Sequence, residues 1–177
     1  MKPIHEMNQG ELAAFIDTHL RDKGIQVILS GGASVAIYSN YQYVSKDLDF
    51  IARFSIDHKK VKSSMQEIDF QRQGRYFHHP ETPYFVEFIS GPPSVGQDPI
   101  SGFKELSLET GKIRLLSPTD CVKDRLAAFY HWGDRQSLEQ ALLVARSREI
   151  DLDNVESWSI REGNKDEFEK FKRRLND

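Results

Sequence analysis

The stretch from residue 26 to residue 54 constrains the fold more than any other part of the chain. Residues 26–30 form a short apolar run that ends at Gly31 and Gly32, which predicts a buried strand. A helix is expected over residues 33–38, with the positive end of its dipole beside the carboxyl end of that strand. Residues 46–54 alternate in polarity, as a strand with one buried face does.

The other segments predict helices and strands around this unit. The periodicity and breaker residues predict helices over 10–22 and 57–68, strands over 75–79 and 84–90, a loop over 91–99, and a hairpin of 104–108 with 112–116. A further helix begins at the Ser117 cap, and another follows the break at Gly133. The tail beyond residue 151 is expected to be partly helical, anchored by Val155, Trp158 and Ile160.

The composition is that of a soluble globular protein. The chain has 177 residues, of which 38% are hydrophobic and 29% charged, and it lacks an apolar run of the about 20 residues that span a bilayer. Residues 1–6 lack the apolar core of a signal peptide, and the single cysteine, Cys121, fits a reducing compartment. We therefore expect a cytoplasmic protein with no membrane partner. The net charge of -3 gives no overall attraction to nucleic acid, and the basic clusters at 59–62 and 172–174 are expected to be solvated helix faces.

Three acidic residues are the candidate catalytic and metal-binding groups. Asp47 and Asp49 are two positions apart, so in a strand they share a face about 6 to 7 Å from each other. Glu87 stands within an apolar strand pattern and would join them if that strand pairs nearby. Two such carboxylates repel by roughly 3 kcal/mol at an effective dielectric of about 20, and a divalent cation removes that cost. Oxygen ligands select Mg²⁺ or Mn²⁺ over zinc.

The two glycines provide a matching site for phosphate. Without side chains at Gly31 and Gly32, phosphate oxygens can approach the backbone, and the N-terminus of the following helix offers free N–H donors. Ser34 can add a hydroxyl. Taken singly, the glycine pair is more often a plain turn, the aspartates an exposed strand edge, and Glu87 a solvated residue. Their joint occurrence on successive elements favours a nucleotide site.

Other reactive residue types receive structural explanations. His78 and His79 are neighbours on a strand and point to opposite faces, so they cannot share a metal in the usual way. Cys121 lies among apolar residues of a helix and is expected to be a packed side chain. His131 stands near a helix end, where a cation is favourable.

At this point the residues resemble a family. Gly31-Gly32-Ala33-Ser34, a short helix, and Asp47-Leu48-Asp49 resemble the nucleotidyltransferase superfamily of the DNA polymerase beta type. The runs 117–128 and 132–141 look like the helical part of small bacterial members related to abortive-infection and toxin-antitoxin nucleotidyltransferases. The resemblance covers about residues 25–146.

The resemblance implies an α+β fold, with a mixed sheet, flanking helices and a helical C-terminal part. It implies a nucleotidyltransferase core over 1–116 and helices over 117–177, packed as one unit. It also implies the following roles: metal binding by Asp47, Asp49 and a third acid, and triphosphate contacts from Gly31, Gly32, Ser34, Lys46 and Lys123. Two positions depart from the family pattern, because Glu87 stands where aspartate is common and Ser137 where an acid is frequent, while Asp134 is kept.

The sequence thus predicts a metal-dependent nucleotidyltransferase that uses an NTP and Mg²⁺ or Mn²⁺. A nucleoside monophosphate would pass to a hydroxyl of RNA such as tRNA, of a protein or of a small molecule, and pyrophosphate would leave. A cognate antitoxin is a further expected partner. Two alternatives stay open: a degenerate nucleotide-binding or partner-binding module, and a metal-dependent phosphodiesterase that needs no triphosphate site.

Overall fold

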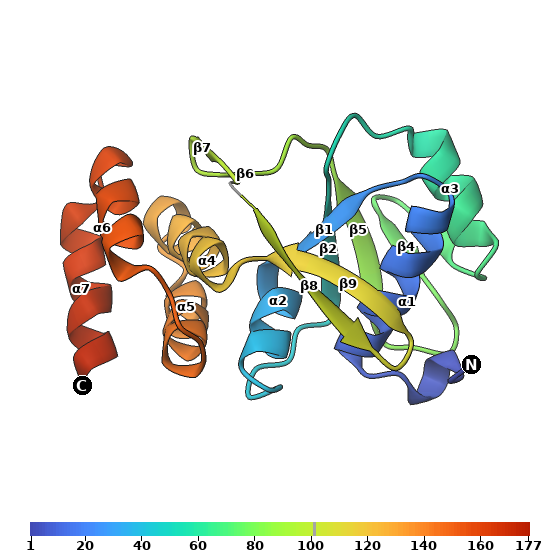
Figure 1. Cartoon of the computed structure of the whole chain (residues 1–177), viewed down its shortest axis with the longest axis horizontal. Coiled ribbons are helices and arrows are strands. Elements are labelled where there is room, and N and C mark those ends of the chain that lie inside the picture. Colours follow the sequence, from blue (N-terminus) through green and yellow to red (C-terminus); the bar gives the residue numbers. More distant parts are fainter. Residues whose placement is uncertain (101) are drawn as a thin grey trace.

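The computed structural model describes residues 1–100 and 102–177 and contains a mixed seven-stranded sheet flanked by helices (Figure 1). The strand order is β3-β4-β5-β2-β1-β9-β8, and β6 and β7 pair separately. The strands are β1 (Val27–Ser30), β2 (Asp47–Ala52), β3 (Gln71–Gln73), β4 (Tyr76–His78), β5 (Phe85–Ile89), β6 (Ser94–Val95), β7 (Asp98–Pro99), β8 (Phe103–Leu108) and β9 (Gly111–Leu116). The helices are η1 (Ile4–Glu6), α1 (Gln9–Asp22), α2 (Gly31–Tyr38), α3 (His58–Gln66), α4 (Pro118–Trp132), α5 (Arg135–Ser147), α6 (Leu152–Arg161) and α7 (Lys165–Asn176). The expected α+β class with a mixed sheet and flanking helices is confirmed.

Helix α1 packs against the sheet beside β9. A capping box fixes its start, since the side chain of Asn8 accepts the N–H of Glu11 and the carboxylate of Glu11 accepts the N–H of Asn8. Further along the helix, the fully buried carboxylate of Asp17 accepts the backbone N–H of Arg114 in β9 at 2.7 Å. Burial raises the pKa of Asp17. Two hydrogen bonds from the Gln9 side chain to the main chain at Ser45 and Asp47 place the first turn of α1 beside the end of β2 that carries the aspartates.

Strand β2 separates the core from the acidic face. Leu48 and Phe50 are fully buried, and Asp47 and Asp49 project to the other face because successive side chains alternate. The Phe50 ring stacks on Phe88 of β5 at 5.8 Å between centroids. Burying an aromatic side chain of this kind contributes about 1.5–3 kcal/mol, so the register of β2 is strongly fixed.

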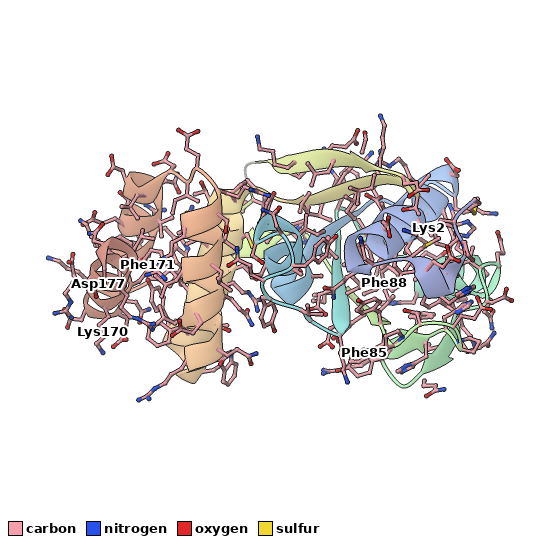
Figure 2. The ribbon with its side chains drawn as sticks, turned by 90° about the horizontal axis from the view of Figure 1, so that it is seen from below. Lys2, Phe85, Phe88, Lys170, Phe171 and Asp177 are labelled. Atoms are coloured by element: carbon pink, nitrogen blue, oxygen red, sulfur yellow. The ribbon has the colours of Figure 1, made fainter. Side chains whose placement is uncertain are left out.

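The neighbouring strand β5 shows the same division into two faces. Phe85 and Phe88, both labelled in Figure 2, are three positions apart in β5 and therefore lie on opposite faces of the sheet. Phe85 contacts Tyr76 edge-on at 4.9 Å between centroids, on the face that carries the acids. Phe88 faces the core.

Helices α4 to α7 form the end of the molecule where the C-terminus lies (Figure 1). Ser117 caps α4, and Gly133, with a φ of +64°, ends it in the left-handed region that favours glycine. In α6 the fully buried Trp158 donates its indole N–H to the carbonyl of Val95 at 3.3 Å. Figure 2 shows Lys170, Phe171 and Asp177 at this end and Lys2 at the opposite end. The buried residues of both parts form one continuous core.

Most expected elements are confirmed, with three corrections. Ile160 is wrong as an anchor of the tail, because its side chain is 49% exposed. Residues 71–73 form strand β3, which the pattern did not predict, and residues 91–99 contain the short β6–β7 ladder within the expected loop. The separation of 1–116 from 117–177 as distinct parts stays a prediction. Across the described residues, every helix falls short of the length and apolar character that crossing a membrane requires.

Candidate active site

The turn between β1 and α2 lies directly against the acidic strand. Gly31 has a φ of +62°, and a Cβ built on it would lie 2.6 Å from Oδ2 of Asp49. A Cβ on Gly32 would meet Ser45 at 3.0 Å and the Tyr43 ring at 3.2 Å. Gly31 is therefore required for its backbone angle, and side chains at either position would crowd Asp49, Ser45 or Tyr43. The structure brings the glycine turn and Asp49 together.

The three predicted acids share one face of the sheet. Asp47 and Asp49 lie on β2, and Glu87 lies on the parallel neighbour β5, opposite Asp49 in the register. Adjacent strands are about 4.8 Å apart, so the side chains of Asp49 and Glu87 are neighbours. Burial, followed by the charges of Asp47 and Glu87, raises the pKa of Asp49 to about 6. The face thus carries a concentration of negative charge.

Glu87 is partly neutralised by an arginine that the sequence did not single out. Nε of Arg75 lies 3.4 Å from Oε1 of Glu87, and the Arg75 side chain is largely exposed. Within residues 1–100 and 102–177, His, Cys, Asp and Glu side chains do not form a group of three or more that could hold a metal ion. The three acids therefore share a face without forming a closed set of ligands in this conformation.

A second arginine, Arg125 of α4, acts on Asp49 through its charge. The guanidinium of Arg125 donates to the carboxylate of Asp124 through Nε at 2.9 Å and to Oε1 of Gln140 through Nη1 at 3.2 Å. Its charge lowers the pKa of Asp49, against the larger effects of burial and of the other acids. Arg125 was missed in the sequence, although a charged Asp-Arg pair inside an apolar helical stripe is a signal that could have found it.

Tyr43 completes this side of the site. Its ring lies over Gly32, and its hydroxyl accepts a long hydrogen bond of 3.5 Å from the Gln136 amide in α5. Burial raises the pKa of Tyr43, and the neighbouring charges of Arg125 and Asp47 act on it in opposite directions. Nothing in the sequence marked Tyr43, because its contacts join a loop to the turn after β1 and to α5.

Of three further residues predicted to contact the triphosphate, Ser34 is used otherwise, Lys123 lies elsewhere and Lys46 lies beside the aspartates. The fully buried hydroxyl of Ser34 donates to the carbonyl of Leu29 at 3.1 Å, so it serves the start of α2 in this conformation. The ammonium of Lys123 lies 3.9 Å from Asp120 and 6.0 Å from the Trp158 ring, and its side chain is only 7% exposed. Lys46 is exposed immediately before β2. The structure does not bring Lys123 to the acidic face, and the role of each residue stays a prediction.

The remaining candidates have structural roles. Asp134 caps α5 and accepts the hydroxyl of the buried Ser137 at 2.6 Å, which lowers the pKa of Asp134. Cys121 is fully buried, and burial raises the pKa of its thiol, as expected for a packed side chain. His79 accepts the N–H of Glu81 and packs against an aromatic ring.

The fold is shared with nucleotidyltransferase-like proteins of known structure. An antigenic nucleotidyltransferase-like protein from Paracoccidioides brasiliensis matches with a TM-score of 0.58 at 16% identity, over 77% of this chain and 74% of that one. The antibiotic-resistance factor ANT(2'')-Ia, in its solution structure, matches with a TM-score of 0.58 at 10% identity, over 95% and 94% of the two chains. A crystal structure of ANT(2'')-Ia in complex with adenylyl-2''-tobramycin matches with a TM-score of 0.53 at 10% identity, over 88% and 93%.

No protein-family model and no curated protein sequence matches the chain. At identities of 10 to 16%, the structural likeness establishes the fold. It confirms the expected nucleotidyltransferase-like architecture, while the relation to abortive-infection and toxin-antitoxin proteins stays a prediction.

Proposed function

We propose that this protein is a metal-dependent nucleotidyltransferase that moves a nucleoside monophosphate from an NTP to a hydroxyl group and releases pyrophosphate. The observation that carries the proposal is the contact between Gly31 and Asp49, because it joins the start of α2 to two carboxylates of one strand. The fold shared with nucleotidyltransferase-like proteins supports the same class of reaction.

The acidic face fits a hard divalent cation by the chemistry of its donors. Asp47 and Asp49 offer only oxygen atoms, and Mg²⁺ is commonly bound by one or two carboxylates together with substrate phosphates. Glu87 can become the third carboxylate ligand once the cation takes the place of Arg75 beside its carboxylate. Because burial and the charges of Asp47 and Glu87 raise the pKa of Asp49, a cation here relieves a cost that the folded chain already carries. When bound, Mg²⁺ or Mn²⁺ neutralises phosphate charge and activates the attacking hydroxyl.

The chain's own residues bind and orient the triphosphate in this proposal. The N-terminus of α2 at Gly31 and Gly32 offers backbone N–H groups and a positive dipole end. Tyr43 lies over Gly32, so a phosphate that reaches this backbone displaces its ring. Arg125 supplies the buried positive charge for the phosphates, since it lies near Asp49 where Lys123 does not. Lys46 can reach the phosphates from the end of the preceding loop.

The attacking hydroxyl approaches from the side of Glu87. Attacking and leaving oxygens lie in line in phosphoryl transfer, so a leaving pyrophosphate at the α2 turn places the acceptor beyond Asp49. Glu87 lies on that side of Asp49 and can accept the hydroxyl proton once the cation has displaced Arg75 from its carboxylate. The acceptor class is RNA such as tRNA, a protein or a small molecule. The small-molecule case has a structural precedent in the adenylyl-2''-tobramycin complex of ANT(2'')-Ia.

The test is transfer of label from α-radiolabelled NTPs with Mg²⁺ to cellular RNA, protein and small-molecule pools. The wild type should label one pool and release pyrophosphate, and Asp47→Ala should not. Asp22→Ala is the matched control, because Asp22 is an exposed aspartate at the end of α1. Transfer by Asp47→Ala at the wild-type rate refutes the proposal. Hydrolysis of a phosphodiester without pyrophosphate release would instead identify a phosphodiesterase.

A second candidate is a degenerate nucleotide-binding module or a module that binds a cognate protein such as an antitoxin. The pairing of Glu87 with Arg75 favours it, because the described acids do not form a ready set of metal ligands. This module would bind an NTP in calorimetry without forming product, or bind its protein partner with no effect of nucleotide. Product formation by the wild type excludes it.

A further inference from the structure

The first turn of α1 holds the main chain that carries Asp47. The Gln9 side chain, 1% exposed, donates its amide N–H groups to the carbonyls of Ser45 at 2.9 Å and Asp47 at 3.1 Å. Both partners are carbonyl oxygens, so the orientation of the amide follows from its contacts. The other end of the side chain, Oε1, is buried without a hydrogen-bond partner among the described residues. A polar side chain is thus kept in the interior for the two bonds that its nitrogen makes.

The Gln9 bonds lie where β1 no longer pairs with β2. The pairing of β1 with β2 ends at Ser30 and Asp49, because the chain turns into α2 at Gly31. Beyond that point β2 continues towards its start without β1 beside it. The hydroxyl of Ser30 donates to the carbonyl of Asp49 at 3.1 Å, and Gln9 then serves the carbonyls of Asp47 and Ser45. Carbonyls two positions apart along a strand face the same side, so side-chain donors continue the ladder where backbone donors stop.

The same turn of α1 also holds the loop before β2. Asn40 and Tyr41 have φ values of 52° and 61°, a region that non-glycine residues rarely adopt and keep only when their surroundings enforce it. The Tyr41 hydroxyl donates to Oδ1 of Asn8 at 3.0 Å, and a Cβ on Gly10 would lie 2.5 Å from that hydroxyl. The loop is therefore docked onto α1 at its start, and Gln9 holds it at its end.

We infer that Gln9 is a positioning residue that sets the place of the Asp47 carboxylate in the metal site. The inference rests on the proposed function, since it assigns Gln9 to the cation site formed by Asp47 and Asp49. Without the amide, the segment from Ser45 to Asp47 loses its Gln9 donors on the side where β1 no longer reaches, and its pairing with β5 holds it from the other side alone. Asp47 then keeps its charge but not its position. Loss of an outer contact of this kind typically weakens metal binding about 10- to 100-fold.

The test compares Gln9→Met, which keeps the size but removes the donor, with Thr18→Val as matched control. Thr18 lies on the same helix and also makes two hydrogen bonds to backbone, to the N–H of Lys112 at 2.9 Å and to its carbonyl at 3.3 Å, away from β2. Mn²⁺ affinity is measured by electron paramagnetic resonance, and hydrogen exchange is followed over residues 41–49. Gln9→Met should weaken Mn²⁺ binding at least about tenfold and speed exchange in this segment. Thr18→Val should change neither.

The outcomes separate this inference from the proposed function. Equal Mn²⁺ affinity in Gln9→Met and a metal-binding wild type overturns the role of Gln9 alone. A wild type that binds no Mn²⁺ overturns the metal site itself, and the role of Gln9 with it. If Gln9→Met does not fold, Gln9→Asn replaces it, because its amide is one methylene too short to reach both carbonyls. A parallel loss of affinity in Thr18→Val would show a general effect of loosening α1 and would likewise refute the inference.

Discussion

Asp49→Asn should stabilise the protein while it abolishes activity. The folded-state pKa of Asp49, about 6, lies above its ordinary value of 3.8, because burial and the charges of Asp47 and Glu87 oppose ionisation. The folded protein therefore holds this proton more tightly than the unfolded chain does. Stability from this group is fully present below about pH 4 and is lost as the pH rises through about 6. Asparagine keeps the shape and removes the ionisation.

The expected gain follows from the size of the shift. A difference of about two pKa units corresponds to about 3 kcal/mol at pH 8, and the same relation leaves only about 0.5 kcal/mol at pH 4. For a chain of this length, 1 kcal/mol moves the melting temperature by about 2–4 °C, so Asp49→Asn should melt about 6–12 °C above the wild type at pH 8. This gain already allows for the attraction between Asp49 and Arg125, because the pKa of about 6 is the net result of all the neighbouring charges.

The assay is thermal and urea unfolding of both proteins in EDTA between pH 4 and pH 8. Asp22→Asn, at an exposed aspartate of α1, is the control and should change the free energy of unfolding by less than about 0.5 kcal/mol. Excess Mg²⁺ should narrow the difference by stabilising only the wild type. A variant that is no more stable than the wild type at pH 8, or equally stabilised at pH 4, refutes the electrostatic reasoning.

Three further outcomes are expected. Gly31→Ala should lower the free energy of unfolding by more than about 1 kcal/mol in urea titrations, because φ is +62° and the new Cβ meets Asp49; a neutral effect would contradict the geometry of the turn. Arg125→Met should raise KM for the NTP at least about tenfold in transfer assays, since a phosphate pair with a buried guanidinium contributes about 1.5–3 kcal/mol. Lys123→Met should leave KM unchanged. A larger rise in KM for Lys123→Met than for Arg125→Met would restore the sequence prediction for Lys123. Cys121 should react with a thiol reagent at pH 8 only on the unfolding timescale, because burial raises its pKa; rapid labelling of the native protein would disprove this.

Local patterns predicted the elements that carry the site. The apolar run before Gly31, the alternation around Asp47 and Asp49, and the Ser117 cap are each contained within a few residues, so the sequence shows them directly. The prediction that Ile160 anchors the tail was wrong because of helix geometry. Ile160 lies five residues after the buried Val155, which rotates it about 140° away from the buried face, whereas Trp158 stays on that face.

Contacts between distant segments could not be read in this way. Arg125 and Lys123 are two positions apart on α4 and so point in nearly opposite directions. Only the packing of α4 against its neighbours decides which of the two charges acts on Asp49. Gln9 lies 38 positions before Asp47, and its role depends on where β1 stops pairing with β2. The sequence contained all of these residues but not their rotation or register.

The charges and contacts of the acidic face favour a site that takes its final arrangement only when a cation binds. Without a cation, the acidic face has two sources of relief, the raised pKa of Asp49 and the exposed Arg75 beside Glu87. A cation competes with both, so its binding should strengthen as the pH rises through about 6 and should release Arg75 towards solvent or substrate. The backbone must meanwhile keep Asp47 in place against the repulsion of its neighbours. The amide of Gln9 provides that restraint on the side of β2 where β1 no longer pairs, while β5 holds the other side.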